Sequence, residues 1–238
     1  SLPADLPAVW GEGLIFGFSG IDGPTRTATG FVATAGRDAY DLVLHTPLKR
    51  RLAVRPPARG SVRAALNDVL VVDLPDGALV LTWLAWHTLV GRAPAGTDVR
   101  LGFVDQDLQP SPDALVTTLD GKGADAVGLL HKGDRFAVSY GTNGDEAGRR
   151  CEAGLDVDLD TTVHDRLAFL AAHAPPREAQ APRLWSKCVS VMKVNALAPE
   201  GAFARRWSTP DRVPHKHMWL WDSAFHAISL ERSASRSP

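Results

Sequence analysis

The chain has 238 residues, of which 45% are hydrophobic and 22% are charged, and its formal net charge at pH 7 is −1. This composition is typical of a globular protein with a sizeable core. The sequence has no polybasic run and no apolar stretch of roughly 18 residues, which excludes electrostatic binding to nucleic acid and a membrane span. The first residues lack a charged segment followed by an apolar core, which favours a cytoplasmic protein, although a signal peptide removed upstream would leave the same start.

Residues 14–140 consist of short β-rich runs separated by turn clusters. Clusters such as Asp22-Gly23-Pro24 and Pro75-Asp76-Gly77 recur along this part, and no long helical pattern lies between them. Strands spaced in this way predict an antiparallel sandwich rather than a βαβ series. We therefore predict a β-sandwich domain over residues 1–142. Its expected strands are 14–18, 27–34, 40–45, 69–72, 79–86, 99–104, 126–130 and 135–140.

Two tryptophans in this part favour an alternative function. Trp83 and Trp86 are three residues apart on an expected strand, which places them on opposite faces, one in the core and one exposed. An exposed indole is the platform that carbohydrate-binding sandwiches use. A non-catalytic sugar-binding module is therefore one alternative, and a purely structural fragment is another.

The expected sandwich contains no evident catalytic pair. Asp105 and Asp107 have the Asp-x-Asp spacing of calcium loops, but the other ligands and the glycine of such a loop are absent, so we interpret them as a solvated turn. The run Gly141-Thr142-Asn143-Gly144 lacks the lysine of a phosphate-binding loop. We interpret this run as a turn as well.

From about residue 145 the apolar residues recur at steps of three and four, which predicts amphipathic helices. Thr161 or Thr162 is the expected N-cap of the second of these helices. The prolines of Ala174-Pro175-Pro176-Arg177 end it, because proline cannot continue a helix. Residues 143–182 are therefore interpreted as a helical linker. Its apolar positions are Ala147, Cys151, Leu155, Val163, Leu167, Leu170 and Ala171.

A further amphipathic helix is expected from residue 183. Leu184, Cys188, Val191 and Met192 share one face of it. Such a face, if uncovered, would promote self-association. Neither Cys188 nor Cys151 belongs to a metal-binding or disulfide-rich spacing, so both are expected to be free thiols.

The most informative segment covers residues 211–226, which hold two Trp, three His, two Asp, one Arg and one Lys. An aromatic platform beside a carboxylate suits a sugar, because the C–H faces of the ring stack on indole and its hydroxyls need fixed partners. A structural interpretation is also open, with the aromatic residues in a core, Asp222 as a helix N-cap and the histidines in solvent. The His-x-His spacing is a poor metal signature, so we expect no metal. No organic cofactor is expected for the chemistry either.

The run Trp-Leu-Trp-Asp-Ser-Ala-Phe-His at residues 219–226 carries a family resemblance. With Pro-His-Lys-His-Met before it, and with Trp185, Asn195 and Pro199-Glu200-Gly201 upstream, it resembles the first sugar-binding segment of (α/α)6-barrel glycoside hydrolases. It is most similar to glycoside hydrolase family 63, with its α-glucosidases and mannosylglycerate hydrolases. Trehalases and amylo-α-1,6-glucosidases resemble it more distantly. The resemblance covers residues 183–231.

The resemblance implies a role for each matching residue. Asp222 is expected to hydrogen-bond the hydroxyls of the sugar, and Trp221 to form the wall of its pocket. The general acid and base of the family lie in later motifs that are absent from this sequence, so no catalytic residue is expected here. Lys216 is expected to lie in a solvated loop. The full set of expected substrate-binding residues is Trp221, Asp222, Trp219, Phe225, His215 and His217.

Taken with the resemblance, residues 183–238 are expected to be the start of a truncated (α/α)6 barrel. Such a barrel needs six helical hairpins and only about one is present, and the tail at residues 231–238 turns polar where a second barrel helix should begin. The expected parent protein is an inverting hydrolase of a small α-linked glucoside, mannoside or oligosaccharide. This chain alone is expected to be inactive. The sequence identifies neither the sugar and its linkage nor the oligomeric state.

Overall fold

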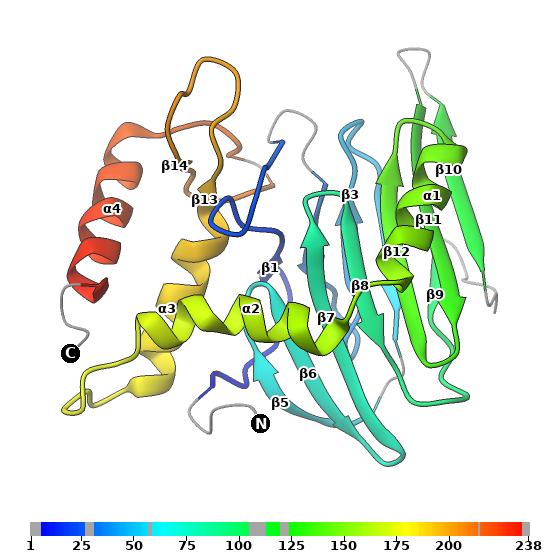
Figure 1. Cartoon of the computed structure of the whole chain (residues 1–238), viewed down its shortest axis with the longest axis horizontal. Helices are drawn as coiled ribbons and strands as arrows, with labels where there is room; N and C mark the ends of the chain where they lie inside the picture. The colour runs from blue at the N-terminus through cyan, green and yellow to red at the C-terminus, as the bar shows by residue number, and fades with distance from the viewer. Residues whose placement is uncertain are drawn as a thin grey trace.

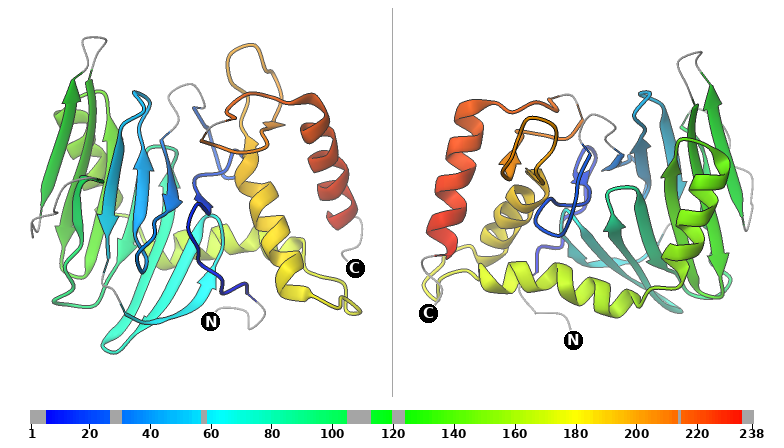
Figure 2. Two further views of the ribbon diagram at one scale, coloured as in Figure 1. Left: turned by 180° about the vertical axis from the view of Figure 1, so that it is seen from behind. Right: turned by 45° about the horizontal axis from the view of Figure 1, so that its top comes forward.

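The computed structural model describes residues 6–26, 31–56, 59–104, 113–119, 124–213 and 215–234. The fold is mainly β, as expected: two antiparallel sheets face one another, and helices lie along the outer face of the larger sheet (Figure 1). The last two helices lie at one end of the sandwich, which Figure 2 shows from two further directions. None of the described helices combines the length and the apolar character that crossing a bilayer requires.

The smaller sheet has the strand order β1-β2-β3-β4-β9 and the larger sheet β10-β11-β12-β8-β7-β6-β5. Every pairing within them is antiparallel. The smaller sheet comprises β1 (Ile15–Phe16), β2 (Val32–Ala35), β3 (Leu42–His45), β4 (Arg51–Arg55) and β9 (Arg100–Phe103). The larger comprises β5 (Ser61–Ala65), β6 (Val69–Leu74), β7 (Gly77–Ala85), β8 (Thr88–Arg92), β10 (Ala114–Leu119), β11 (Ala124–Lys132) and β12 (Arg135–Gly141).

The main core lies between the two sheets and is built around aromatic rings. Trp83 of β7 is fully buried there, and its ring meets that of Phe31 edge to face at 5.6 Å. The ring centroid of Phe16 in β1 lies 6.3 Å from that of the same Trp83 indole. Such aromatic pairs stabilise a core beyond the area that they bury. The inward residues of both sheets complete one continuous cluster.

A second core covers the outer face of the larger sheet. It brings β5–β8 and β12 together with α1 (Gly144–Leu155), α2 (Leu159–Ala172) and α3 (Pro182–Asn195). Because β6 is therefore buried on both faces, it carries the continuous apolar run 69–72 rather than an alternating pattern. The expected helical linker is thus a third layer of this domain. Its helix α1 lies across β11 and β12, with the thiol of Cys151 3.3 Å from the carbonyl oxygen of Gly128.

The helix boundaries are set by caps and prolines. Asn143 caps α1 by accepting a hydrogen bond from the backbone N–H of Glu146 (2.9 Å). The expected cap of α2 at Thr161 or Thr162 is wrong, because both lie inside the first turn. Asp158 is the N-cap, and its carboxylate accepts the backbone N–H of Thr161 (3.2 Å). A charged acceptor at this position also complements the positive end of the helix.

A buried ionic network fixes α2 and α3 to the sandwich. The ammonium of Lys193 on α3, 2% exposed, lies 2.6 Å from Asp68 and 3.1 Å from Asp22. Arg166 of α2 lies 3.6 Å from Asp22 and donates to the backbone carbonyl of Trp83 (3.1 Å). Burial raises the pKa of Asp68, and the Lys193 charge opposes that rise. Two carboxylates and two cations thus balance one another in the buried interior.

The C-terminal part is a helical hairpin closed by a small ribbon. After α3 the chain forms β13 (Ala196–Leu197), which pairs with β14 (Trp207–Ser208), and then α4 (Leu220–Ala234). Helices α3 and α4 run antiparallel, side by side (Figures 1 and 2). The apolar face expected on α3 is largely uncovered, with Leu184 64% exposed and Val191 37% exposed. Met192 instead packs partly against the second core.

Candidate functional site

Helix α4 turns its aromatic side away from the body of the protein. Trp221 is 73% exposed, Phe225 68% and Ile228 50%, and their spacing places them on one helical face. Trp219, which precedes the helix, is also exposed. A surface helix normally buries its apolar face. The structural interpretation of these aromatic residues as core is therefore wrong for this chain.

The opposite side of α4 is polar and faces β14. The hydroxyl of Ser223 donates to the backbone carbonyl of Ser208 (2.8 Å), and Nδ1 of His226 lies 3.2 Å from the Ser208 hydroxyl. Burial lowers the pKa of His226, with the Asp222 carboxylate opposing. Asp222 is the third residue of α4, in its first turn, so the N-cap interpretation is wrong. Its charge there complements the helix dipole, and the residue is half-exposed.

His215 belongs to the turn that precedes α4. Its Nδ1 lies 2.6 Å from Oδ2 of Asp211, and Oδ1 of the same carboxylate accepts the backbone N–H of Val213 (2.9 Å). The ring of Trp219 meets that of His215 edge to face, with the centroids 6.1 Å apart. His215 therefore orders the loop between β14 and α4.

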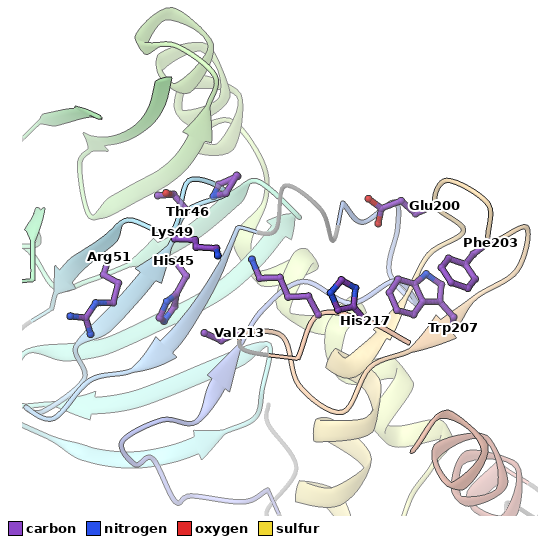
Figure 3. A pocket seen from close by; sticks show the side chains of 11 residues that line it. His45, Thr46, Lys49, Arg51, Glu200, Phe203, Trp207, Val213 and His217 are labelled. Carbon is purple, nitrogen blue, oxygen red and sulfur yellow. The ribbon is translucent and has the colours of Figure 1, made fainter. Parts of the chain in front are cut away.

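A pocket of about 760 Å³ lies between the smaller sheet and the C-terminal part (Figure 3). Its volume lies within the range of small-molecule sites. One wall comes from the turn between β3 and β4, and the other from the β13–β14 loop and the segment before α4. Figure 3 shows the wall from the sheet facing the wall that includes Glu200 and His217. The lining residues are His45, Thr46, Pro47, Lys49, Arg51, Glu200, Phe203, Trp207, Val213, Lys216 and His217.

The turn between β3 and β4 is held by hydrogen bonds to Asp125. The hydroxyl of Thr46 donates to the buried carboxylate of Asp125, which also accepts the backbone N–H of Leu48 (3.0 Å). Within this turn Lys49 has φ of 61°, in the left-handed region that glycine or asparagine ordinarily occupies. A lysine in that conformation is an outlier that the surrounding hydrogen bonds sustain.

Positive charge dominates the pocket. Lys49, Arg51 and Lys216 line it against a single lining acid, Glu200. Burial lowers the pKa of Lys216, and the charges of Lys49 and Arg212 lower it further. The loop around Lys216 is exposed at His215 and His217, as expected, whereas Lys216 itself is half-buried against other cations.

Arg212, which is buried, and His45, which lines the pocket, share this electrostatic field. The guanidinium of Arg212 donates to the backbone carbonyls of Phe18 (2.9 Å) and Val194 (2.7 Å), and burial lowers its pKa to about 10. Burial also lowers the pKa of His45 to about 4, with the charges of Arg51 and Lys216 adding to the effect. His45 is therefore neutral at pH 7.

An aromatic pair forms the other wall of the pocket. Phe203 stacks on Trp207 with the ring centroids 4.9 Å apart and the planes 22° from parallel. Trp207 is 8% exposed, and its buried Nε1 has no hydrogen-bond partner among the described residues. Glu200 reaches the same wall from the β13–β14 loop, where its backbone pairs with that of Phe203. This wall offers a ring surface and a carboxylate.

The structure does not gather the six expected substrate-binding residues into this pocket. Of the six, His217 lines it, whereas Trp221, Asp222 and Phe225 belong to α4. Glu200 belongs to the segment that carries the family resemblance, and it does line the pocket. The β3–β4 residues carried no sequence signal, because nothing near Lys49 indicates that residues 200–217 lie opposite.

The sandwich tryptophans differ from the expectation that one of them is exposed. A register shift between Trp83 and Ala85 in β7 breaks the alternation, so Trp83 and Trp86 both pack on the main core. Trp86 is only partly exposed, and the guanidinium groups of Arg26 and Arg150 lie 5.7 Å and 5.5 Å from its ring centroid. It is not an open platform for a sugar.

Other expected features have simple outcomes. Cys151, buried, and Cys188, exposed, are both free thiols. Within the described ranges no three His, Cys, Asp or Glu side chains form a group that could hold a metal ion. Asp105 and Asp107 lie outside the described residues.

Comparisons of this chain with protein-family models, curated proteins and solved structures gave no match.

Proposed function

We propose that this chain is the N-terminal part of an inverting glycoside hydrolase of the (α/α)6-barrel class, acting on a small α-linked glucoside or mannoside. In this proposal α3 and α4 are the first hairpin of the barrel, residues 1–142 are the supporting sandwich, and residues 143–182 join them. Trp221 and Asp222 contact the sugar, and the catalytic acid and base come from elsewhere in the parent protein.

The observation that carries this proposal is the inverted polarity of α4. Its Ser223 and His226 face β14, whereas Trp221, Phe225 and Ile228 are turned to solvent. Neighbouring barrel helices would cover the later turns of this face, and large exposed apolar patches mark such interaction surfaces. The first turn would remain at the rim, where an indole can stack on a sugar ring beside an accepting carboxylate.

The rival proposal, a carbohydrate-binding sandwich, has less support. It depends on an open indole on the sheets, and Trp83 is fully buried while Trp86 is covered by two guanidinium groups. We therefore prefer the glycosidase proposal.

The test uses nitrogen-labelled protein of this chain, titrated with methyl α-glucoside and methyl α-mannoside. The indole N–H signal of Trp221, assigned from a Trp221→Phe variant, should shift with one of the two sugars. Asp222→Asn should weaken this binding about tenfold or more, because a charged acceptor becomes in part a donor. Ile228→Ala is the matched control on the same face and should leave the affinity unchanged. Sugar-dependent shifts that leave the Trp221 signal unmoved and persist in Asp222→Asn would refute the proposed roles.

A further inference from the structure

We propose that the pocket between the β3–β4 turn and the Glu200–His217 segment binds a sugar-sized organic anion, one that carries a phosphate or a carboxylate. This site differs from the one proposed on α4. It does not depend on the glycosidase proposal.

The charge of the pocket indicates an anion. The side chains of Lys49, Arg51 and Lys216 form no hydrogen bond or ion pair with any described residue. Glu200 is the one acidic residue among the described residues that line the pocket, so the lining carries three cationic side chains and one anionic side chain. Unneutralised cations in a concave site repel one another, and a bound anion would relieve that repulsion. Phosphate and carboxylate groups are what lysine and arginine bind best.

The conformation of Lys49 supports the same inference. A glycine would occupy its left-handed position without strain, whereas lysine has a Cβ that crowds the backbone. The Asp125 carboxylate and the hydrogen bonds of Thr46 hold the turn in place. Residues held in such strained backbone conformations occur preferentially at active sites and ligand-binding sites.

The opposite wall indicates that the anion carries a ring. Phe203 and Trp207 stack on one another at this wall and offer an apolar face to a sugar. The carboxylate of Glu200, which lines the same wall, can accept a hydrogen bond from a hydroxyl. Figure 3 shows Glu200, Phe203 and Trp207 across the pocket from His45, Lys49 and Arg51. A ligand with an anionic end and a hydroxylated ring fits this polarity.

The test is calorimetric titration of the purified chain with four probes. Glucose 6-phosphate and glucuronate carry the two anions, methyl α-glucoside is the neutral ring, and inorganic phosphate is the anion alone. We expect one or both anionic sugars to bind at least about tenfold more tightly than methyl α-glucoside and than phosphate. Preference between glucose 6-phosphate and glucuronate identifies the anion. The inference is overturned if neither anionic sugar binds more tightly than both methyl α-glucoside and inorganic phosphate, whether because all four probes bind equally or because none binds.

Variants distinguish loss of binding in this pocket from the effect of a changed net charge and from loss of folding stability. Lys49→Gly relieves the left-handed backbone, so its Tm should stay within about 2 °C of the parent while affinity for the anionic sugar falls about tenfold or more. Lys216→Gln should show a similar loss. Arg50→Gln is the matched control, since it removes one charge from the same turn but does not line the pocket. An equal loss in Arg50→Gln would overturn the inference.

Two further variants test the ring and the identity of the site. Phe203→Ala should weaken binding of the anionic sugar but not of inorganic phosphate. Trp221→Ala and Asp222→Asn should leave both unchanged. Loss of anionic-sugar binding in these two α4 variants would assign the binding to α4 and overturn the inference. If neutral sugars fail to bind α4, the proposed function is refuted but this inference is unaffected.

Discussion

Replacing Lys193 with methionine should test how the C-terminal helices are held to the sandwich. The substitution keeps much of the buried volume but removes the ammonium that lies 2.6 Å from Asp68 and 3.1 Å from Asp22. Arg166, 3.6 Å from Asp22, is then the remaining cation of the network. Breaking a buried pair by removing one partner costs about 3–5 kcal/mol, because a charge stays buried without compensation. That is a large share of the roughly 5–15 kcal/mol that stabilises a domain.

Urea unfolding followed by circular dichroism and by tryptophan fluorescence measures this cost, provided that the two transitions coincide. Lys132→Met is the matched control, because Lys132 pairs with Asp156 at 3.0 Å while both side chains are exposed. It should cost at most about 1 kcal/mol. Lys193→Met combined with Asp68→Asn restores the charge balance and should recover part of the loss.

The pH dependence gives a second signature of the same variant. Burial already raises the folded-state pKa of Asp68 above its unfolded value, and loss of Lys193 raises it further. The folded variant therefore binds a proton that the unfolded chain releases, so lowering the pH towards the unfolded value of about 4 stabilises it relative to the parent. A loss of stability no greater than that of Lys132→Met, at every pH, would refute the argument that removing Lys193 leaves a buried charge uncompensated.

Three other perturbations have expected outcomes. His45 has its folded-state pKa lowered to about 4 by burial, so the unfolded chain takes up the proton first, and the free energy of unfolding should fall as the pH drops from about 6.5 to 4. His45→Gln should reduce that fall by about 1–2 kcal/mol, allowing for partial exposure. Phe225→Ser with Ile228→Ser should lower self-association in sedimentation experiments without lowering Tm, since both side chains are exposed. The purified chain should not hydrolyse nitrophenyl α-glucosides. Activity that co-purifies with it and is lost in Asp222→Ala would contradict the proposal that the catalytic acid and base come from elsewhere in the parent protein.

The strand pattern was predictable where the chain alternates or where a run is bounded by strong turns. The expected runs 69–72 and 135–140 fall within β6 and β12. The sequence analysis did not predict β8. Only Trp86 and His87 separate the end of β7 from the start of β8, so the two strands together look like one apolar run. It also missed β4 and β5, whose flanking arginines and prolines disguise short strands. Pairing across the sheet decided these cases, and a local pattern does not contain it.

One candidate site could be predicted from the sequence and the other could not. The motif around Trp221 is contiguous, so its aromatic and acidic residues were evident from the sequence, although their exposure depends on which face of α4 meets β14. The cationic pocket is not contiguous: Lys49 and Lys216 are brought together by the packing of the C-terminal part on the smaller sheet. A lysine with φ above zero is likewise a property of the folded turn and has no signature in composition.

The loop between β14 and α4 connects the two proposed sites physically. Thr209 donates to the backbone carbonyl of Asp211 (2.8 Å) and to that of His215, and Arg212 anchors the loop to the sandwich. His217 at the end of this loop lines the pocket, and Trp219 directly precedes α4. A ligand that draws Lys216 towards Lys49 would therefore act on the same short segment that orients the first turn of α4.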